Sequence, residues 1–331
     1  MIHVTPIDEL MAHSPGLPAP DDLDQFWRDT LAEAAECPLK VKAEPVTETP
    51  LRSVLVYDVT FSGYGGQPIR AWYLVPRDLG GSRPTVIEYI GYGGGRGLPS
   101  EWLFWSAAGY PHMIMDSRGQ GSAWRTGDTP DTGSSGSPRV PGFLTDGLPD
   151  RDAYYYRRLF TDAVRAVDAA AQLPHSDPTR LVTTGTSQGG ALAIAAASLH
   201  PGVARTMPNV PFLCDIRRSA HEATSGPYAE LVKWCHTHRT KADDALRALA
   251  YFDVAVLASR ATCPALFSVA LRDETCPPPG VFACYNRYGG PKEIISYEWN
   301  DHEGGEAFLQ LDQAAWLVPL VTDNAGALPG S

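Results

Sequence analysis

The chain has 331 residues, of which 38 are acidic and 27 basic, so its formal net charge is −11. This excess of negative charge, with no basic run to offset it, argues against a nucleic acid partner and against binding to an anionic membrane surface. Hydrophobic residues make up 44% and charged residues 20% of the sequence, a balance typical of a folded domain and not of a disordered chain.

The N-terminal segment and the cysteines predict a cytoplasmic protein. Asp8, Glu9 and Asp22 lie where a secretory signal would need apolar residues, and no apolar run is long enough to span a bilayer. The six cysteines are scattered without a C-x-x-C pair, which is typical of reduced thiols in a chain of this size.

We expect a single domain over residues 1–331 that begins with an N-terminal helical extension, residues 1–50. Leu23, Phe26 and Trp27 fall on one face at helical spacing, behind acidic residues that are favourable at a helix start. This extension is therefore predicted to contain one amphipathic helix.

From residue 53 onward the pattern changes to short strands. Alternation of apolar and polar residues at 53–64 and 69–75 predicts an antiparallel hairpin at a sheet edge. Apolar runs then alternate with helical segments, which predicts an α/β fold with a mostly parallel sheet covered by helices. The predicted strands are 85–90, 112–115, 181–184, 265–270 and 293–299, and the predicted helices are 101–108, 152–172, 188–199, 281–288 and a last helix through residue 320.

Two stretches interrupt this alternation. Residues 117–150 are rich in Gly, Ser, Pro and Asp, and such long loops in compact domains are usually functional or mobile. Residues 212–252 are helical where a short connection would suffice. We interpret them as a helical insertion that forms a cap over the C-terminal edge of the sheet.

The sequence G-T-S-Q-G at residues 185–189 is the sharpest chemical signal. An apolar strand precedes it and an alanine-rich helix follows, which is the context of a nucleophilic serine on a strand-to-helix turn. The glycines two residues before and after Ser187 suit a turn with no room for a Cβ atom. The alternative is an ordinary turn in which Ser187 only caps the helix.

A serine nucleophile needs a base, and His302 is the best placed of the nine histidines. It follows a predicted strand and so lies at the same sheet edge as Ser187. His236 and His238 beside Cys235 faintly resemble a metal site, but they lack a carboxylate or a distant ligand, and we interpret them as solvated residues.

The base needs an orienting acid, for which Asp273 is the candidate because it follows another predicted strand. The chain order of nucleophile, acid and base then matches that of α/β-hydrolases. Asp301 and Glu303 are rivals, although immediate neighbours of His302 cannot easily turn back onto its ring, and Glu274 could substitute. Alone, Asp273 could equally be a helix cap.

Hydrolysis of an ester also needs donors for the developing oxyanion. The backbone N–H of Gln188 is one candidate, and that of Tyr92, in the glycine-rich loop after the strand at 85–90, is the other. The loop has neither G-K-[ST] nor a dinucleotide fingerprint, so no nucleotide cofactor is expected.

These residues resemble carbohydrate esterase family 7, the acetyl xylan esterase and cephalosporin C deacetylase group of the α/β-hydrolase superfamily. The resemblance covers nearly the whole chain. It rests on R-G-Q at 118–120, G-T-S-Q-G at 185–189 and H-E at 302–303. The flanking sequences, such as E-Y-I-G-Y-G-G-G-R-G and V-P-F-L-C-D-I-R-R, are also similar.

The resemblance implies a role for each candidate residue. Ser187 would be the nucleophile, His302 the base, Asp273 its partner, and the N–H groups of Tyr92 and Gln188 the oxyanion donors. Members of the family are typically hexamers that act on short acetylated xylo-oligosaccharides and on cephalosporin C, without a metal or other cofactor. The resemblance also permits perhydrolysis with peroxide.

Three further residues of the motifs are expected to have structural roles near the site. By resemblance, Arg118 and Gln120 would brace the loop around the site, and Glu303 would lie beside the base. From the residues alone, Arg118 could equally hold local carbonyl groups.

The leading hypothesis is therefore a serine esterase for small acyl groups, with a small acetylated substrate as its partner. The same scaffold could act on another small acyl or aryl ester. A carbohydrate-binding protein without catalysis is a third hypothesis, since eight tryptophans and 14 tyrosines could form sugar platforms. All members of the candidate triad are present, which argues against it.

Overall fold

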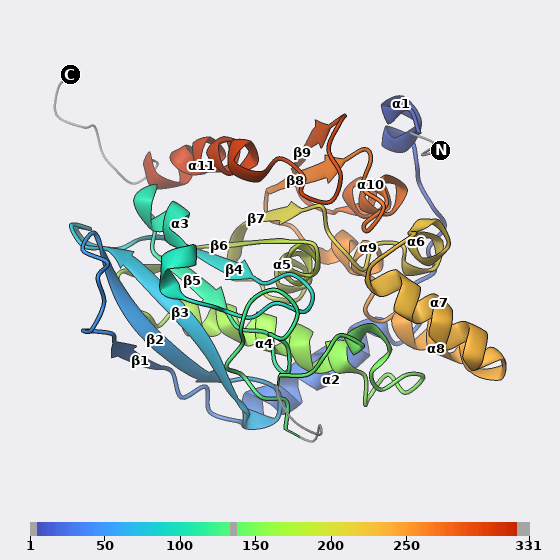
Figure 1. Ribbon diagram of the computed structural model, residues 1–331, viewed down its shortest axis with the longest axis horizontal. Coiled ribbons are helices and arrows are strands. Elements are labelled where there is room, and N and C mark those ends of the chain that lie inside the picture. Colours follow the sequence, from blue (N-terminus) through green and yellow to red (C-terminus); the bar gives the residue numbers. More distant parts are fainter. Residues whose placement is uncertain (1–4, 133–137, 323–331) are drawn as a thin grey trace.

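A computed structural model describes residues 5–132 and 138–322, which surround one nine-stranded sheet with helices on both faces (Figure 1). The strand order is β1-β2-β3-β5-β4-β6-β7-β8-β9. The strands are β1 (Lys42–Pro45), β2 (Val54–Ser62), β3 (Pro68–Pro76), β4 (Arg83–Tyr89), β5 (His112–Met115), β6 (Ser176–Thr186), β7 (Val203–Asn209), β8 (Ala265–Ala270) and β9 (Lys292–Tyr297).

The sheet is parallel from β5 to β9 in this order, and β1, β2 and β3 extend it with antiparallel pairs. The predicted mostly parallel sheet is therefore confirmed. The predicted hairpin is present as β2 and β3, but the outermost strand at that edge is β1.

The helices divide between the two faces of the sheet. In Figure 1, α3 and α11 lie on one side, and α2, α4 and α5 lie on the other. The helices are α1 (Ile7–Met11), α2 (Leu23–Glu36), α3 (Leu103–Ala107), α4 (Tyr155–Ala170), α5 (Gln188–Leu199), α6 (Ile216–Glu222), α7 (Pro227–Thr237), α8 (Ala242–Leu249), α9 (Val254–Leu257), α10 (Pro278–Arg287) and α11 (Glu306–Thr322). No helix in the described ranges is both long and apolar enough to cross a membrane.

Alternate residues of the parallel strands point to opposite faces of the sheet, and each face packs into a hydrophobic core. Val86 and Val182 point to the face covered by α3 and α11, where they pack with Trp105 and Leu317. Their neighbours in the strands pack with α4 and α5 in the larger core. Because both faces are buried, the central strands read as continuous apolar runs, which is the pattern that predicted them.

Two strands were not predicted from the sequence. In β7, Arg205 and Pro208 interrupt the apolar run, yet Thr206 and Met207 are buried between β6 and β8. Strand β1 is short and mostly exposed, so it has no hydrophobic pattern to detect. Strand β7 depends on pairing with β6 and with β8, which lies far along the chain. Strand β1 depends on pairing with β2, which has the stronger hydrophobic pattern.

The N-terminal helix α2 packs against α4 through aromatic rings. The Trp27 and Phe160 rings are stacked with centroids 5.8 Å apart, and Phe252 meets both rings edge-on. The indole Nε1 of Trp27 donates to the carbonyl of Tyr251 at 3.0 Å. The amphipathic helix predicted here therefore joins α4 to the segment that follows α8.

The register of the sheet brings four loops to one edge. Tyr89 at the end of β4 pairs with Gly185 near the end of β6, and Ala270 at the end of β8 pairs with Tyr297 at the end of β9. The loops that follow these strands carry the predicted site residues. Carboxyl ends of parallel strands are the usual position of sites in such sheets.

A buried ion pair anchors the long loop that begins after β5. Arg118 and Asp162 on α4 are both fully buried, and the guanidinium binds the carboxylate through two nitrogens, with Nη2 to Oδ1 at 2.6 Å. Asp162 also accepts the backbone N–H of Tyr64 at 2.8 Å. Such bidentate pairs fix geometry as well as charge, so the loop starts from one defined position.

The first prediction concerns this ion pair. We expect Arg118→Ala to lower the free energy of unfolding by about 3–5 kcal/mol, because it leaves a buried carboxylate without its counter-charge. Urea denaturation measures this change. The matched control is Arg247→Ala, which breaks an ion pair with Asp244 that is more than half exposed and should cost less than about 0.5 kcal/mol. Equal effects of the two variants would contradict the assignment.

Candidate functional site

Ser187 lies on a strained turn between β6 and α5. Its backbone has φ 59° and ψ −116°, in a region that residues with a side chain rarely adopt. A Cβ atom at Gly185 would lie 2.6 Å from the carbonyl oxygen of Tyr89, and one at Gly189 would overlap the same oxygen. The two glycines therefore allow the turn to pack directly on the end of β4.

The helix-capping alternative for Ser187 does not fit the geometry. Ser187 occupies the N-cap position of α5, but its side chain makes no capping hydrogen bond. The hydroxyl instead faces Cys276, with Oγ and Sγ 3.8 Å apart. Gln188 is the first residue of α5, so its N–H has no acceptor in a preceding helical turn.

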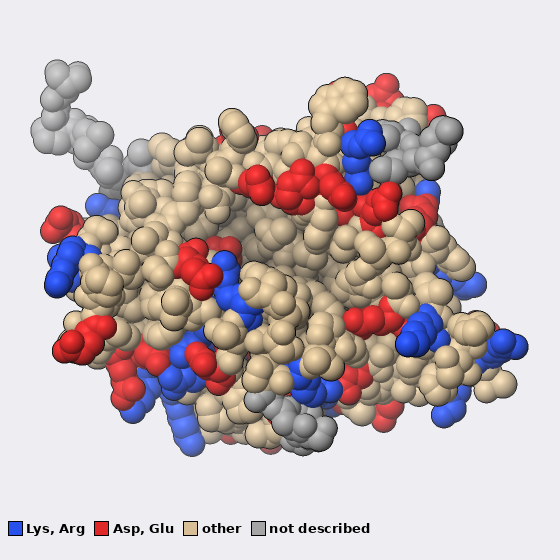
Figure 2. All heavy atoms as spheres, in the orientation of Figure 1, with Lys and Arg blue, Asp and Glu red and all other residues tan. Residues whose placement is uncertain are grey.

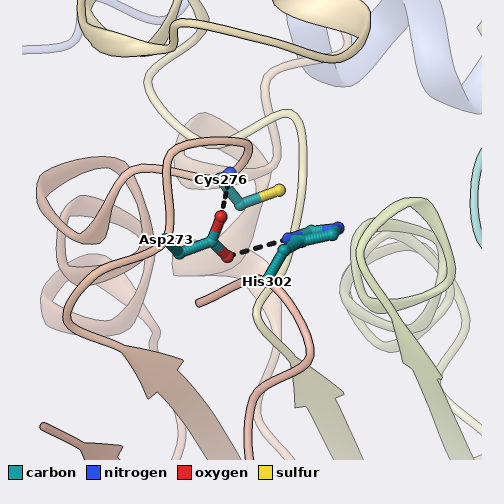
Figure 3. A group of neighbouring side chains, drawn as sticks. All are labelled: Asp273, Cys276 and His302. Atoms are coloured by element: carbon teal, nitrogen blue, oxygen red, sulfur yellow. Dashed lines mark hydrogen bonds and ion pairs between the residues drawn. The ribbon is translucent and has the colours of Figure 1, made fainter. Parts of the chain in front are cut away.

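The imidazole of His302 is bonded to Asp273. Nδ1 of His302 lies 2.8 Å from Oδ2 of Asp273 (Figure 3). The other oxygen, Oδ1, accepts the backbone N–H groups of Thr275 and Cys276, each at 2.8 Å. The carboxyl group is buried, whereas the His302 side chain is about one-third exposed. Asp273 is thus held in one orientation and presents a single oxygen to the ring.

The rival carboxylates bond elsewhere. Asp301 accepts the backbone N–H groups of Glu274 and His302, and Glu303 accepts from the side chain of Asn300 and the N–H of Asp301. The carboxylate of Glu274 accepts the hydroxyl of Thr224 at 2.6 Å. These contacts hold the loop in shape and leave Asp273 facing the imidazole.

Ser187 and His302 line one cavity of about 560 Å³. Within the described residues no hydrogen bond joins their side chains, and such bonds are often long before substrate binds. Figure 2 shows a hollow near the centre of the viewed side of the molecule, with charged side chains along parts of its rim. The other residues that line the cavity are Gly91, Tyr92, Ala123, Trp124, Pro141, Thr186, Gly226, Pro227, Glu230 and Thr275.

Tyr92 is held by its hydroxyl group and by its carbonyl group. The hydroxyl accepts three backbone N–H groups of residues 142–144, at 2.7 to 3.2 Å, and donates to Glu230 of α7 at 2.6 Å. The carbonyl accepts Nε1 of Trp124 at 2.8 Å. Burial raises the pKa of Glu230, although the bond from Tyr92 opposes this. One side chain thus ties the glycine-rich loop to the long loop and to α7.

Gln120 connects the glycine-rich loop to Gln188. Its Oε1 accepts the N–H of Gly93 at 2.6 Å, and its Nε2 donates to Oε1 of Gln188 at 2.8 Å. Gln188 in turn donates from Nε2 to the carbonyl of Ile90 at 3.0 Å. The two glutamines are fully buried, so this network fixes the loop against the start of α5. Arg118 lies outside the cavity lining and holds the base of the loop.

Cys276 was not a candidate from the sequence, although it is only three residues after Asp273. The side chain is 2% exposed, and burial together with the nearby carboxylate of Asp273 raises the pKa of its thiol well above the ordinary value. Glu230 and Trp124 were also missed. Both come from segments without a motif and reach the site only through the fold.

Larger surface cavities lie away from these residues. One of about 630 Å³ lies between the N-terminal extension and α8, and one of about 820 Å³ lies along α6, α7 and α8. Neither contains any of the residues predicted for the site. The smaller cavity is the one that Ser187 and His302 both line.

Comparisons with known proteins show the family and the fold of this chain. A family model described as acetyl xylan esterase (AXE1) matches residues 1–320. The acetyl esterase Axe7A of Xylanibacter ruminicola is 28% identical over 291 residues, which cover 86% of this chain and 63% of that relative. This chain thus spans less than two thirds of the length of that relative.

Solved structures match over a larger share of both chains. The acetyl xylan esterase from Paenibacillus sp. R4 is 35% identical, with a TM-score of 0.87 over 96% of this chain and 100% of that chain. Acetyl xylan esterase 1 from Thermoanaerobacterium sp. JW/SL YS485 is 29% identical, with a TM-score of 0.84 over 94% and 98%. These matches confirm the predicted α/β-hydrolase fold.

The second prediction concerns the hydroxyl of Tyr92. We expect Tyr92→Phe to lower the free energy of unfolding by roughly 1–3 kcal/mol, because it removes the acceptor of three backbone N–H groups and the donor to Glu230. Tyr89→Phe is the matched control, since that buried hydroxyl makes one bond, to the carbonyl of Ala163. Urea denaturation compares the two. A smaller loss for Tyr92→Phe than for Tyr89→Phe would contradict the anchoring role.

Proposed function

Because the chain belongs to the acetyl xylan esterase family, we propose that it is a serine esterase that removes acetyl groups from short acetylated xylo-oligosaccharides. The observation that carries this proposal is the position of Ser187. Ser187 lies on a strained turn and lines the same cavity as His302. Nδ1 of His302 is hydrogen-bonded to the buried carboxylate of Asp273. Nucleophile, base and orienting acid thus occur together, as acyl transfer requires.

In the proposed mechanism His302 is the general base. Its Nδ1 carries the proton that faces Asp273, which leaves the lone pair of Nε2 free to take the proton of Ser187. The oxygen of Ser187 then forms a bond to the acetyl carbonyl carbon. Asp273 stays ionised and stabilises the imidazolium that results.

Negative charge develops on the carbonyl oxygen at this step. We assign the N–H groups of Tyr92 and Gln188 as its donors. The bonds that hold the carbonyl and hydroxyl of Tyr92, and the network of Gln120 and Gln188, support this assignment because they fix both main chains before substrate binds. The N-terminus of α5 adds its dipole.

Three further proton transfers complete the reaction. The imidazolium of His302 protonates the oxygen of the sugar as the carbon–oxygen bond breaks, which leaves acetyl-Ser187. His302 then takes a proton from water, the hydroxide attacks the acetyl carbon, and acetate leaves as Ser187 regains its proton. The alcohol side of the substrate would extend past Trp124, which lines the cavity and is more than half exposed.

Several finer points are carried by the family resemblance. The acetyl ester of cephalosporin C is a second proposed substrate, with other small acyl or aryl esters as the alternative. We also infer a homo-oligomer, a hexamer by resemblance, and a cytoplasmic location. The six free cysteines fit a reducing compartment.

The third prediction tests the acyl group. Hydrolysis of p-nitrophenyl esters should be fast for acetate and fall steeply as the acyl chain lengthens, because the space beside Ser187 is bounded by the sulfur of Cys276. Ser187→Ala should abolish turnover while the protein stays folded. Release of acetate from acetylated xylo-oligosaccharides and from cephalosporin C then identifies the alcohol side. Equal turnover of long and short acyl esters would contradict the proposal.

The fourth prediction tests the acid. Asp273→Asn should lower kcat for p-nitrophenyl acetate by roughly 10³–10⁴-fold, because an amide favours the wrong tautomer of His302. Asp301→Asn is the matched control, since Asp301 lies next to His302 but bonds only main-chain N–H groups. It should keep kcat within about tenfold of the parent. If the two variants lose activity equally, Asp273 is not the orienting acid.

A further inference from the structure

A thiol, an imidazole and a carboxylate meet beside the cavity that Ser187 and His302 line. The ligand atoms of Asp273, Cys276 and His302 all lie within 4.8 Å of one another. Figure 3 shows the sulfur of Cys276 on the same side of Asp273 as the His302 ring, and the carboxylate accepts hydrogen bonds from the ring and from the N–H of Cys276. No other group of three such residues occurs within the described part of the chain.

The proposed ester hydrolysis has no step for the sulfur of Cys276. Its backbone N–H helps to orient Asp273, a task that any residue except proline could perform. The sulfur itself is buried and faces Oγ of Ser187 at 3.8 Å. The structure thus places a soft donor atom within the triad, where the reaction does not require one.

These three donors suit one class of ligand. Zinc binds thiolate sulfur at about 2.3 Å and imidazole nitrogen or carboxylate oxygen at about 2.0–2.2 Å, usually with four ligands in a tetrahedron. Ligand atoms around such an ion are roughly 3.5 Å apart, so the group needs only small side-chain rotations to close on a cation. Mg²⁺ and Ca²⁺ prefer all-oxygen sites and do not match it.

We propose that Asp273, Cys276 and His302 form a reversible inhibitory site for Zn²⁺ or a softer divalent cation such as Cd²⁺. Binding would replace the S–H proton of Cys276, which passes to solvent, by a bond from sulfur to the metal. The oxygen of Ser187 or a water supplies the fourth ligand. The dication brings the charge that makes a buried thiolate favourable at this position.

Such a cation would stop catalysis whether it binds Nε2 or Nδ1 of His302. A bond to Nε2 occupies the lone pair that would accept the proton of Ser187. A bond to Nδ1 displaces its proton to Nε2, and the base again has no lone pair toward the serine. The inhibitory effect rests on the proposed esterase function, whereas binding of the cation does not.

The two histidines at the C-terminal end of α7 do not form a competing site of this kind. His236 and His238 lie near Cys235 in sequence, but the ring of His238 packs against Trp234 with centroids 4.6 Å apart. These three residues form no ligand cluster in the structure. Cys235 is partly exposed and therefore serves as a control for adventitious binding to a surface thiol.

The fifth prediction is tested by inhibition and by direct binding. Zn²⁺ should inhibit hydrolysis of p-nitrophenyl acetate, and a chelator should restore it. Cys276→Ser should raise the inhibition constant at least about tenfold, measured against its own metal-free activity, because it removes the sulfur ligand. Cys235→Ser should leave the constant unchanged. Equal inhibition of the parent and of Cys276→Ser would overturn the proposal.

Direct binding is measured without turnover in Ser187→Ala. Titration with Cd²⁺ should produce the ultraviolet charge-transfer band of a cadmium–thiolate bond, and this band should be lost in the double variant with Cys276→Ser. A band that persists without Cys276, or no band at all, would overturn the site. If the band depends on Cys276 but the parent hydrolyses no ester, the metal site stands and the proposed function fails.

Discussion

The close packing of the Ser187 turn on the end of β4 is the constraint on which the site depends. Tyr89 presents its carbonyl oxygen to this turn, and side chains at Gly185 or Gly189 would collide with it. Without that contact the start of α5 would move away from the glycine-rich loop. The same contact therefore holds the strained turn of Ser187 beside the glycine-rich loop, and Ser187 and Tyr92 line the same cavity.

Buried polar residues then fix the loops that the sheet alone cannot hold. Arg118 fastens the long loop to Asp162, and Gln120 bridges Gly93 and Gln188. Burying an ion pair and two amides gains little net stability, because desolvation offsets most of the attraction. Their consequence is geometric, since a network satisfied at every atom permits one arrangement of the loops.

The sequence allowed the sheet and the motif residues to be predicted because their signals are local. Apolar runs such as 112–115 and 265–270 coincide with observed strands, and the glycines around Ser187 predict the turn. Strand β7 was missed because Arg205 and Pro208 break its pattern. Glu230 was missed because no local pattern relates it to Tyr92, 138 positions away. The choice of Asp273 over its neighbours depended on chain order, and the bond to His302 exists only in the fold.

The loop after β8 links the acid to the thiol. Oδ1 of Asp273 accepts the N–H groups of Thr275 and Cys276, and this turn both aims Oδ2 at His302 and fixes the main chain at Cys276. The side chain of Cys276 then projects toward Ser187. Orientation of the acid and placement of the sulfur thus follow from one backbone conformation. The proposed soft metal site would be a direct consequence of the turn that orients the Asp273 carboxylate, given a cysteine three residues after Asp273.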